Sequence, residues 1–187
     1  CDISSVKGSV IVKDFSKEKF KMNLKSNKVN VIKILPGGVV TAKDTAEIEL
    51  DANGEFVRNP EVDLVKVAVV ERHQGTGNVA CGFLKGYGIK EGAVALSVAH
   101  DSHNIIVVGV NDEEMKFAVN SLIEQEGGIV LVKEGKVIES MPMPIAGLMS
   151  DQSGEWVDQK LTDIHEKAYE ELGICGDVEP VMTLCFM

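Results

Sequence analysis

The chain has 187 residues, a formal net charge of −10 and 44% hydrophobic residues. This length suits one domain, or one domain with a small appendage, and can bury a core. The apolar runs are of strand length, well short of the roughly 20 residues of a membrane-spanning helix. An acidic chain also lacks the clustered Lys and Arg that a phosphate backbone requires. We therefore expect a soluble globular protein that binds neither membrane nor nucleic acid.

The four cysteines form no C-x-x-C pair, so neither a zinc knuckle nor a disulfide framework is indicated. A reduced, cytoplasmic protein is the simplest expectation. The chain opens on Cys1 without an apolar signal region, which predicts that the natural start lies elsewhere. Residues 1–35 hold eight lysines and three acidic residues, and we interpret them as the solvated face of strands.

The first part of the chain reads as β-structure. Near-alternate apolar residues predict four strands in residues 9–60: "SVIVKDF" (9–15), "KFKMNL" (19–24), "KVNVIKIL" (28–35) and "AEIELD" (46–51). Pro36-Gly37-Gly38 and the turn "DANGEF" (51–56) separate them. Residues 1–60 are therefore predicted to be a β-rich N-terminal segment.

From Asp63 onward the periodicity of the apolar residues changes. Strands are predicted in "DLVKVAVVERH" (63–73), "GAVALSVAH" (92–100) and "NIIVVGV" (104–110), the last apolar enough to be buried on both faces. A helix is predicted over 112–125, capped by Asn111 or Asp112 and ended by Gly127-Gly128. A hairpin with Glu134-Gly135 at its turn follows over 128–142, and a second helix over about 153–172.

This order of elements predicts an α+β fold with mixed β-sheet layers and about two flanking helices. We expect residues 61–187 to form an α+β domain that packs with the β-rich segment 1–60 as one compact unit.

Two histidines lie in "AHDSHN" (99–104), between two apolar segments. His100, Asp101 and His103 offer imidazole and carboxylate groups, which suit metal ligation or general acid–base chemistry. The alternative is a plain connection, in which Asp101, Ser102 and Asn104 bond the backbone of the turn itself.

A second polar cluster, "ERHQGTGN" (71–78), follows another apolar strand. Arg72 and His73 could meet a carboxylate or phosphate, and the glycines would allow close backbone approach. The P-loop spacing is absent, and "GFLKGYGIKEG" (82–92) does not match a dinucleotide fingerprint. His165 lies beside Ile164 on the predicted last helix, and we expect it to be a boundary residue of that helix face rather than a ligand.

Several unusual strings occur at consistent spacing over nearly the whole chain. They are "KVNVIKILPGGVVT", "ERHQGTGN", "GFLKGYGIKEGAVALSVAHDSHNIIVVGVND", "GGIVLVKEGKVIESMPMPIAGLMSD" and "PVMTLCFM". In these strings the chain resembles the C-terminal region of bacterial and archaeal adenine deaminases of the amidohydrolase superfamily.

The resemblance implies metal-dependent hydrolysis of adenine to hypoxanthine and ammonia, a step of purine salvage. In that family a (β/α)8 barrel holds a dinuclear manganese or iron centre through histidines that include an H-x-H pair, and the metal activates water. A barrel needs about 250 residues. This chain has four histidines and no H-x-H, so we expect it to be the C-terminal portion of such an enzyme, inactive alone, with no metal-binding residue and no cofactor of its own.

We hypothesise that the two polar loops face the barrel mouth or a subunit contact and help to close the adenine pocket. The candidate pocket-facing residues are Arg72, His73, His100, Asp101, His103 and Asn104. The expected partners are the enzyme's own barrel and further copies in a homo-oligomer.

One alternative is a stand-alone purine- or metal-binding module without deaminase activity. It would use His73, His100, Asp101 and His103, but the missing initiator methionine and missing tail count against it. A complete small hydrolase without metal is a remote third reading, since no nucleophile has partners in a known spacing.

Overall fold

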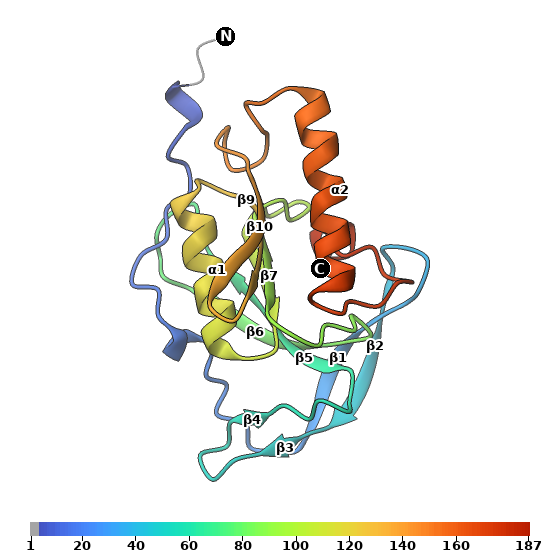
Figure 1. The fold of residues 1–187 in the computed structure, drawn as a ribbon. Helices are drawn as coiled ribbons and strands as arrows, with labels where there is room; N and C mark the ends of the chain where they lie inside the picture. Colours follow the sequence, from blue (N-terminus) through green and yellow to red (C-terminus); the bar gives the residue numbers. More distant parts are fainter. Residues whose placement is uncertain (1–3) are drawn as a thin grey trace.

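The computed structural model describes residues 4–187, which form an eight-stranded sheet with a helix on each face (Figure 1). The strand order is β10-β9-β7-β8-β5-β6-β1-β2, and a separate two-stranded sheet is formed by β3 and β4. β1 pairs with β6 in parallel, and the other neighbours pair antiparallel. A mixed sheet with flanking helices confirms the α+β class.

The strands are β1 (Lys28–Ile34), β2 (Thr41–Glu47), β3 (Glu49–Leu50), β4 (Phe56–Val57), β5 (Leu64–Val70), β6 (Val79–Lys85), β7 (Ala93–Leu96), β8 (Ile105–Gly109), β9 (Gly128–Lys133) and β10 (Lys136–Pro142). The α-helices are α1 (Asp112–Glu124), α2 (Gly154–Glu170) and the short α3 (Met182–Cys185). Two 3-10 helices, η1 (Ser4–Val6) and η2 (Lys17–Phe20), lie in the N-terminal segment.

The centre of the sheet is buried on both faces. Every residue of β7 and β8 is buried, because α1 covers one face of these strands and α2 with the C-terminal segment covers the other. The prediction that 104–110 forms a strand buried on both sides is thereby confirmed.

Both long helices begin at the residues that their sequences indicate. The side chain of Asn111 accepts a hydrogen bond from the Glu114 amide at 2.9 Å and caps α1. Ser153 caps α2 in the same way by accepting from the Trp156 amide at 3.3 Å. The β9–β10 hairpin with its turn at Glu134-Gly135 is confirmed as well.

Two predicted strands are wrong. Residues 9–15 form no strand, and residues 19–24 overlap the 3-10 helix η2 instead. The alternation of apolar residues has another cause. Val10, Val12 and Phe15 pack, together with the fully buried Phe20, against the hydrophobic core that α1 covers. Apolar alternation therefore reflects burial of one side here, without a partner strand.

β6 was not predicted, since Cys81 and Gly82 interrupt its apolar pattern. It pairs with β5 over its full length and with β1 in parallel, so β1 and β2 extend the same sheet as the later strands. Within the described residues no helix combines the length and apolar character needed to cross a membrane.

Candidate functional site at one end of the sheet

Three connections meet at one end of the sheet, and we call them the loop cluster. They are the β5–β6 loop (71–78), the β7–β8 loop (97–104) and the β10–α2 loop (143–153). Strand directions bring them together, because β8 runs antiparallel to both β5 and β7, and β10 ends opposite the start of β9. The N-terminal segment and the β10–α2 loop lie at this end in Figure 1.

Arg72 lies at the centre of the loop cluster and is only 1% exposed. Its Nε donates to the carbonyl oxygen of His103, and its Nη2 donates to that of Ala146 at 3.1 Å. Burial lowers the pKa of Arg72, although a guanidinium stays protonated at neutral pH. One side chain from the first loop thus holds the backbones of the other two.

Ser97 makes a second buried connection. Its Oγ donates to the Gly147 carbonyl at 2.5 Å and accepts from the Gly128 amide at 2.8 Å. The backbones approach so closely that a Cβ on Gly127 would lie 2.6 Å from the Cα of Gly147. Glycine is therefore required at these crossings.

His100 is presented outward, with 59% of its side chain exposed. Its Nδ1 lies 3.3 Å from Oδ1 of Asp101, and its ring stacks on Phe186 with centroids 4.9 Å apart. The backbone amide of His100 donates to the Cys185 carbonyl at 2.5 Å. The short helix α3 and the residue after it therefore pack against the β7–β8 loop and support it.

The other candidates from the sequence contribute to the loops themselves. His73 Nε2 lies 2.8 Å from the Ser102 carbonyl oxygen, and Asn104 accepts from the Arg72 amide at 3.4 Å. His103 has a left-handed φ of 49° and a buried Nδ1 that has no hydrogen-bond partner among the described residues. The fold brings all six candidates together, and their role at a pocket stays a prediction.

Sequence reasoning missed Glu71, which organises the β5–β6 loop. Its carboxylate accepts from the backbone amides of His73, Gln74 and Thr76 at 2.5, 2.7 and 2.9 Å. These hydrogen bonds stabilise the charged form and lower the pKa of Glu71 to about 2. An acidic residue at the start of a Gly-rich loop was the signal available in the sequence.

The docking of residues 6–19 was also missed, and these residues contact the β5–β6 and β10–α2 loops of the loop cluster. The Val6 carbonyl accepts from the Ala146 amide at 2.9 Å, and the Ile11 amide donates to the Arg72 carbonyl at 2.8 Å. Farther on, Lys19 Nζ donates to the Gly77 carbonyl at 3.0 Å. This segment is consequently part of the same assembly as the loops.

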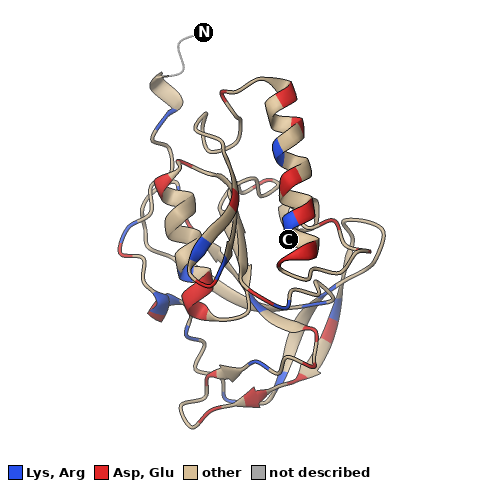
Figure 2. Ribbon diagram, in the orientation of Figure 1, with Lys and Arg blue, Asp and Glu red and all other residues tan. Residues whose placement is uncertain are grey.

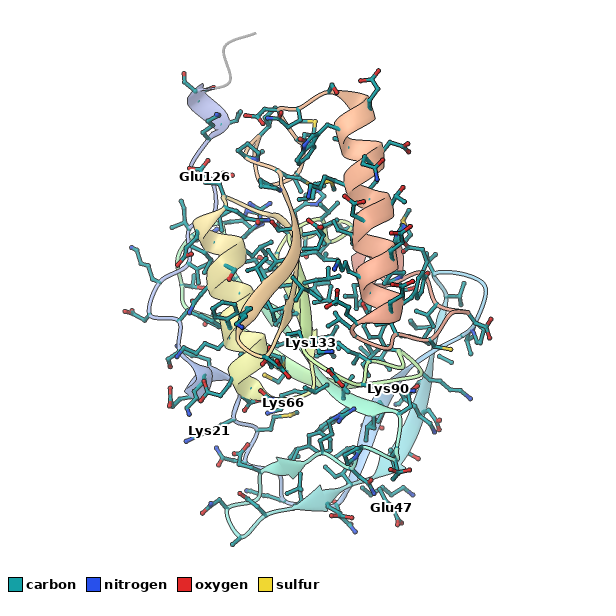
Figure 3. The ribbon with its side chains drawn as sticks, viewed as in Figure 1. Lys21, Glu47, Lys66, Lys90, Glu126 and Lys133 are labelled. Carbon is teal, nitrogen blue, oxygen red and sulfur yellow. The ribbon has the colours of Figure 1, made fainter. Side chains whose placement is uncertain are left out.

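The opposite end of the sheet has a hollow of about 560 Å³ at the N-terminus of α1. Its charges are largely neutralised within it: Lys66 pairs with Asp112 at 2.7 Å, and Lys17 pairs with Glu113 at 2.5 Å. Figure 2 shows basic and acidic residues side by side there, and Figure 3 labels Lys66 and Lys21 beside the foot of α1.

Residues 4–187 contain no group of three or more His, Cys, Asp or Glu side chains placed to hold a metal ion. The loop cluster offers one exposed imidazole–carboxylate pair, His100 with Asp101, and one hydroxyl that donates to a carboxylate, Thr76 to Glu71 at 2.9 Å. Such a surface can bind a neighbouring part of a protein, shape a site there or exchange protons with it. It does not fit a dinuclear metal centre.

The mixed sheet, its three linked loops and the sequence they carry define one class of domain. A sequence model of the adenine deaminase C-terminal domain matches residues 38–187, and the chain belongs to this family. It is 65% identical to adenine deaminase 2 of Desulfotalea psychrophila over all of this chain, and 49% identical to adenine deaminase of Ligilactobacillus salivarius over 99% of it. Adenine deaminase of Bacillus subtilis is 43% identical over 92% of this chain.

In each of these comparisons the chain spans about a third of the relative's length, 30 to 32%. The matched region is therefore one part of larger proteins that bear the name adenine deaminase.

Proposed function

We propose that the chain serves as the C-terminal part of an adenine deaminase, an enzyme that hydrolyses adenine to hypoxanthine and ammonia in cytoplasmic purine salvage. Support comes from the family match and from relatives of that name at 43 to 65% identity. The larger part of the enzyme, which we expect to be a barrel, would supply the metal centre of manganese or iron. Since the described residues offer no ligand set, no step of metal chemistry is assigned to them.

The contribution we propose for this domain is to cover the catalytic part with the loop cluster. One observation carries this placement: residues 6–19 run along the β5–β6 and β10–α2 loops, where the Ala146 amide donates to the Val6 carbonyl and the Ile11 amide donates to the Arg72 carbonyl. Since the family is that of a C-terminal domain, a preceding catalytic part would connect through this segment. The catalytic part would then join the domain at the end of the sheet where His100 and Asp101 are exposed.

Active sites often lie at such domain boundaries. His100 and Asp101 would then line the rim of the adenine pocket, where an imidazole can hydrogen-bond a purine nitrogen or relay a proton. Contacts between copies of the enzyme in a homo-oligomer are a second use of the same surface.

The test uses the complete enzyme. His100→Ala and His103→Ala are compared with Lys136→Ala, an exposed residue at the β9–β10 turn on the opposite end of the sheet. We expect kcat/KM for adenine to fall in the histidine variants and to remain unchanged in the lysine variant. Unchanged kcat/KM and unchanged oligomer size in both histidine variants would refute a role of the loop cluster at the pocket or at a subunit contact.

The activity itself is tested separately. The complete enzyme is assayed for ammonia and hypoxanthine release from adenine, and the isolated chain serves as a control that we expect to be inactive. Absence of deamination by the metal-loaded complete enzyme would refute the proposed reaction.

A further inference from the structure

Arg72 differs from the other buried cation of the domain. Lys66 is 6% exposed and pairs with the carboxylate of Asp112 at 2.7 Å. Arg72 is 1% exposed, and within residues 4–187 it forms no ion pair with a carboxylate. The side chain of Arg72 donates to two backbone carbonyls, those of His103 and Ala146. Burying a cation without a counter-ion is costly, and an apolar residue of similar size would often fill a core equally well.

Both acceptors of Arg72 lie in strained backbone. His103 has φ of 49° and Ala146 has φ of 57°, a left-handed conformation that is unfavourable for a residue with a Cβ. The planar guanidinium offers donors in a fixed fork, so it can hold two carbonyls in a set relative position. Gly147 completes the arrangement, because any Cβ there would lie 2.7 Å from Nη1 of Arg72.

The exposed part of the β7–β8 loop depends on this arrangement. His100 and Asp101 precede His103 by only two or three residues, and Asp101 itself has φ of 66°. The direction of their side chains follows from the path of the backbone, which Arg72 holds at the His103 carbonyl and the Cys185 carbonyl holds at the His100 amide.

We propose that Arg72 is a positioning residue of the deaminase: its guanidinium fixes the β7–β8 and β10–α2 loops so that His100 is presented to the catalytic part. This proposal rests on the proposed function. Arg72 is buried, and it acts through the carbonyls of His103 and Ala146.

The experiment is a double-mutant cycle in the complete enzyme. Arg72→Met removes the donors while keeping an apolar stem, Arg72→Lys keeps the charge but loses the fork, and His100→Ala removes the presented group. Lys66→Met serves as the matched control, because it removes a buried cation at the other end of the sheet. All kcat/KM values are measured well below the melting temperature of each variant and normalised to folded enzyme.

We expect Arg72→Met to lower kcat/KM on the order of 10- to 100-fold, since a displacement near 1 Å can have effects of this size. Arg72→Lys should lower kcat/KM less than Arg72→Met does. Combining Arg72→Met with His100→Ala should lower kcat/KM little beyond the larger single effect, because both act through one loop. Lys66→Met should lower the melting temperature without changing kcat/KM. Multiplicative losses in the double variant, or a normal kcat/KM in Arg72→Met, would overturn the proposal.

A measurement independent of activity separates this proposal from the proposed function. Amide hydrogen exchange in Arg72→Met should accelerate in residues 99–104 and 143–149 and remain unchanged at the β9–β10 turn. Unchanged exchange in both loops would overturn the positioning role. If exchange accelerates and the kcat/KM of His100→Ala and His103→Ala is unchanged, the pocket role of the loops fails instead.

Discussion

The contact between Gly147 and Arg72 allows a matched test of how tightly the loop cluster is packed. Gly147 has φ of +70°, and a Cβ at this position would lie 2.7 Å from Nη1 and 3.0 Å from Cζ of Arg72. Gly135, at the β9–β10 turn, has nearly the same φ of +67° with nothing within 4 Å of its Cβ position. Alanine at either position is strained in the backbone, but only alanine at 147 also meets a buried side chain.

The two costs can be estimated separately. A left-handed alanine should cost about 1–2 kcal/mol in both variants. Forcing a methyl group against the buried guanidinium should add about 1–3 kcal/mol in Gly147→Ala alone. For a chain of this size each kcal/mol lowers the melting temperature by roughly 2–4 °C.

Urea and thermal unfolding of the two variants and the parent chain measure this difference directly. We expect Gly147→Ala to be less stable than Gly135→Ala by the cost of forcing the methyl group against the guanidinium. The m-value should be unchanged. Equal destabilisation of the two variants would refute close packing of Arg72 beneath Gly147, and with it the linked loops described above.

Three further predictions concern other parts of the molecule. Phe20→Ala should cost about 3–5 kcal/mol in urea unfolding because Phe20 is 0% exposed, while Val40→Ala, at 64% exposed, should stay within about 0.5 kcal/mol; a small effect of Phe20→Ala would contradict docking of the N-terminal segment. The pKa of Glu71 is lowered from 4.5 to about 2, so its contribution to stability is present above pH 4.5 and is lost as the pH falls through about 2. Glu71→Gln should therefore be less stable than the parent at pH 7, with a difference that narrows between pH 4.5 and pH 2; a difference independent of pH would contradict this. Burial raises the pKa of Cys185 to about 11 while Cys175 is exposed, so iodoacetamide at pH 8 should label Cys175 first in peptide mapping, and equal labelling rates would argue against the buried thiol.

The sequence predicted those elements in which the buried residues recur at one regular spacing. The α1 residues Met115, Ala118, Val119 and Leu122 share a face at helical spacing and are all buried, and Asn111 caps the helix as expected. The β9–β10 hairpin followed from two apolar runs around Glu134-Gly135. Local periodicity and capping chemistry were sufficient in these regions.

Prediction failed where partners distant in the sequence decide the structure. Residues 9–15 alternate like a strand, yet what they bind is the β5–β6 loop, through the Ile11 amide and the Arg72 carbonyl. β6 lies between β5 and β1 in the sheet, and its parallel partner β1 is distant in the sequence. Pairing over such separations leaves no mark in a local window of sequence.

Proximity of the two histidine-bearing loops was predictable in outline, because each follows an apolar strand of the same sheet. The linkage between them was not: Arg72 reaches across to His103 and Ala146, and Ser97 reaches to Gly147. A backbone carbonyl is an acceptor in every residue type, so the sequence does not show which carbonyl a buried arginine will find.

Features of both readings of "AHDSHN" are present in this turn. A plain turn should use its polar side chains to satisfy its own backbone. This turn does so through Ser102, whose Oγ accepts from the Asn104 amide at 3.4 Å, and it is also held from outside, by Arg72 at the His103 carbonyl and by the Cys185 carbonyl at the His100 amide. The side chains of His100 and Asp101 remain 59% and 91% exposed. The loop is therefore held in shape by buried neighbours while its His100–Asp101 pair faces outward, which is the arrangement that the proposed contact with another part of the enzyme requires.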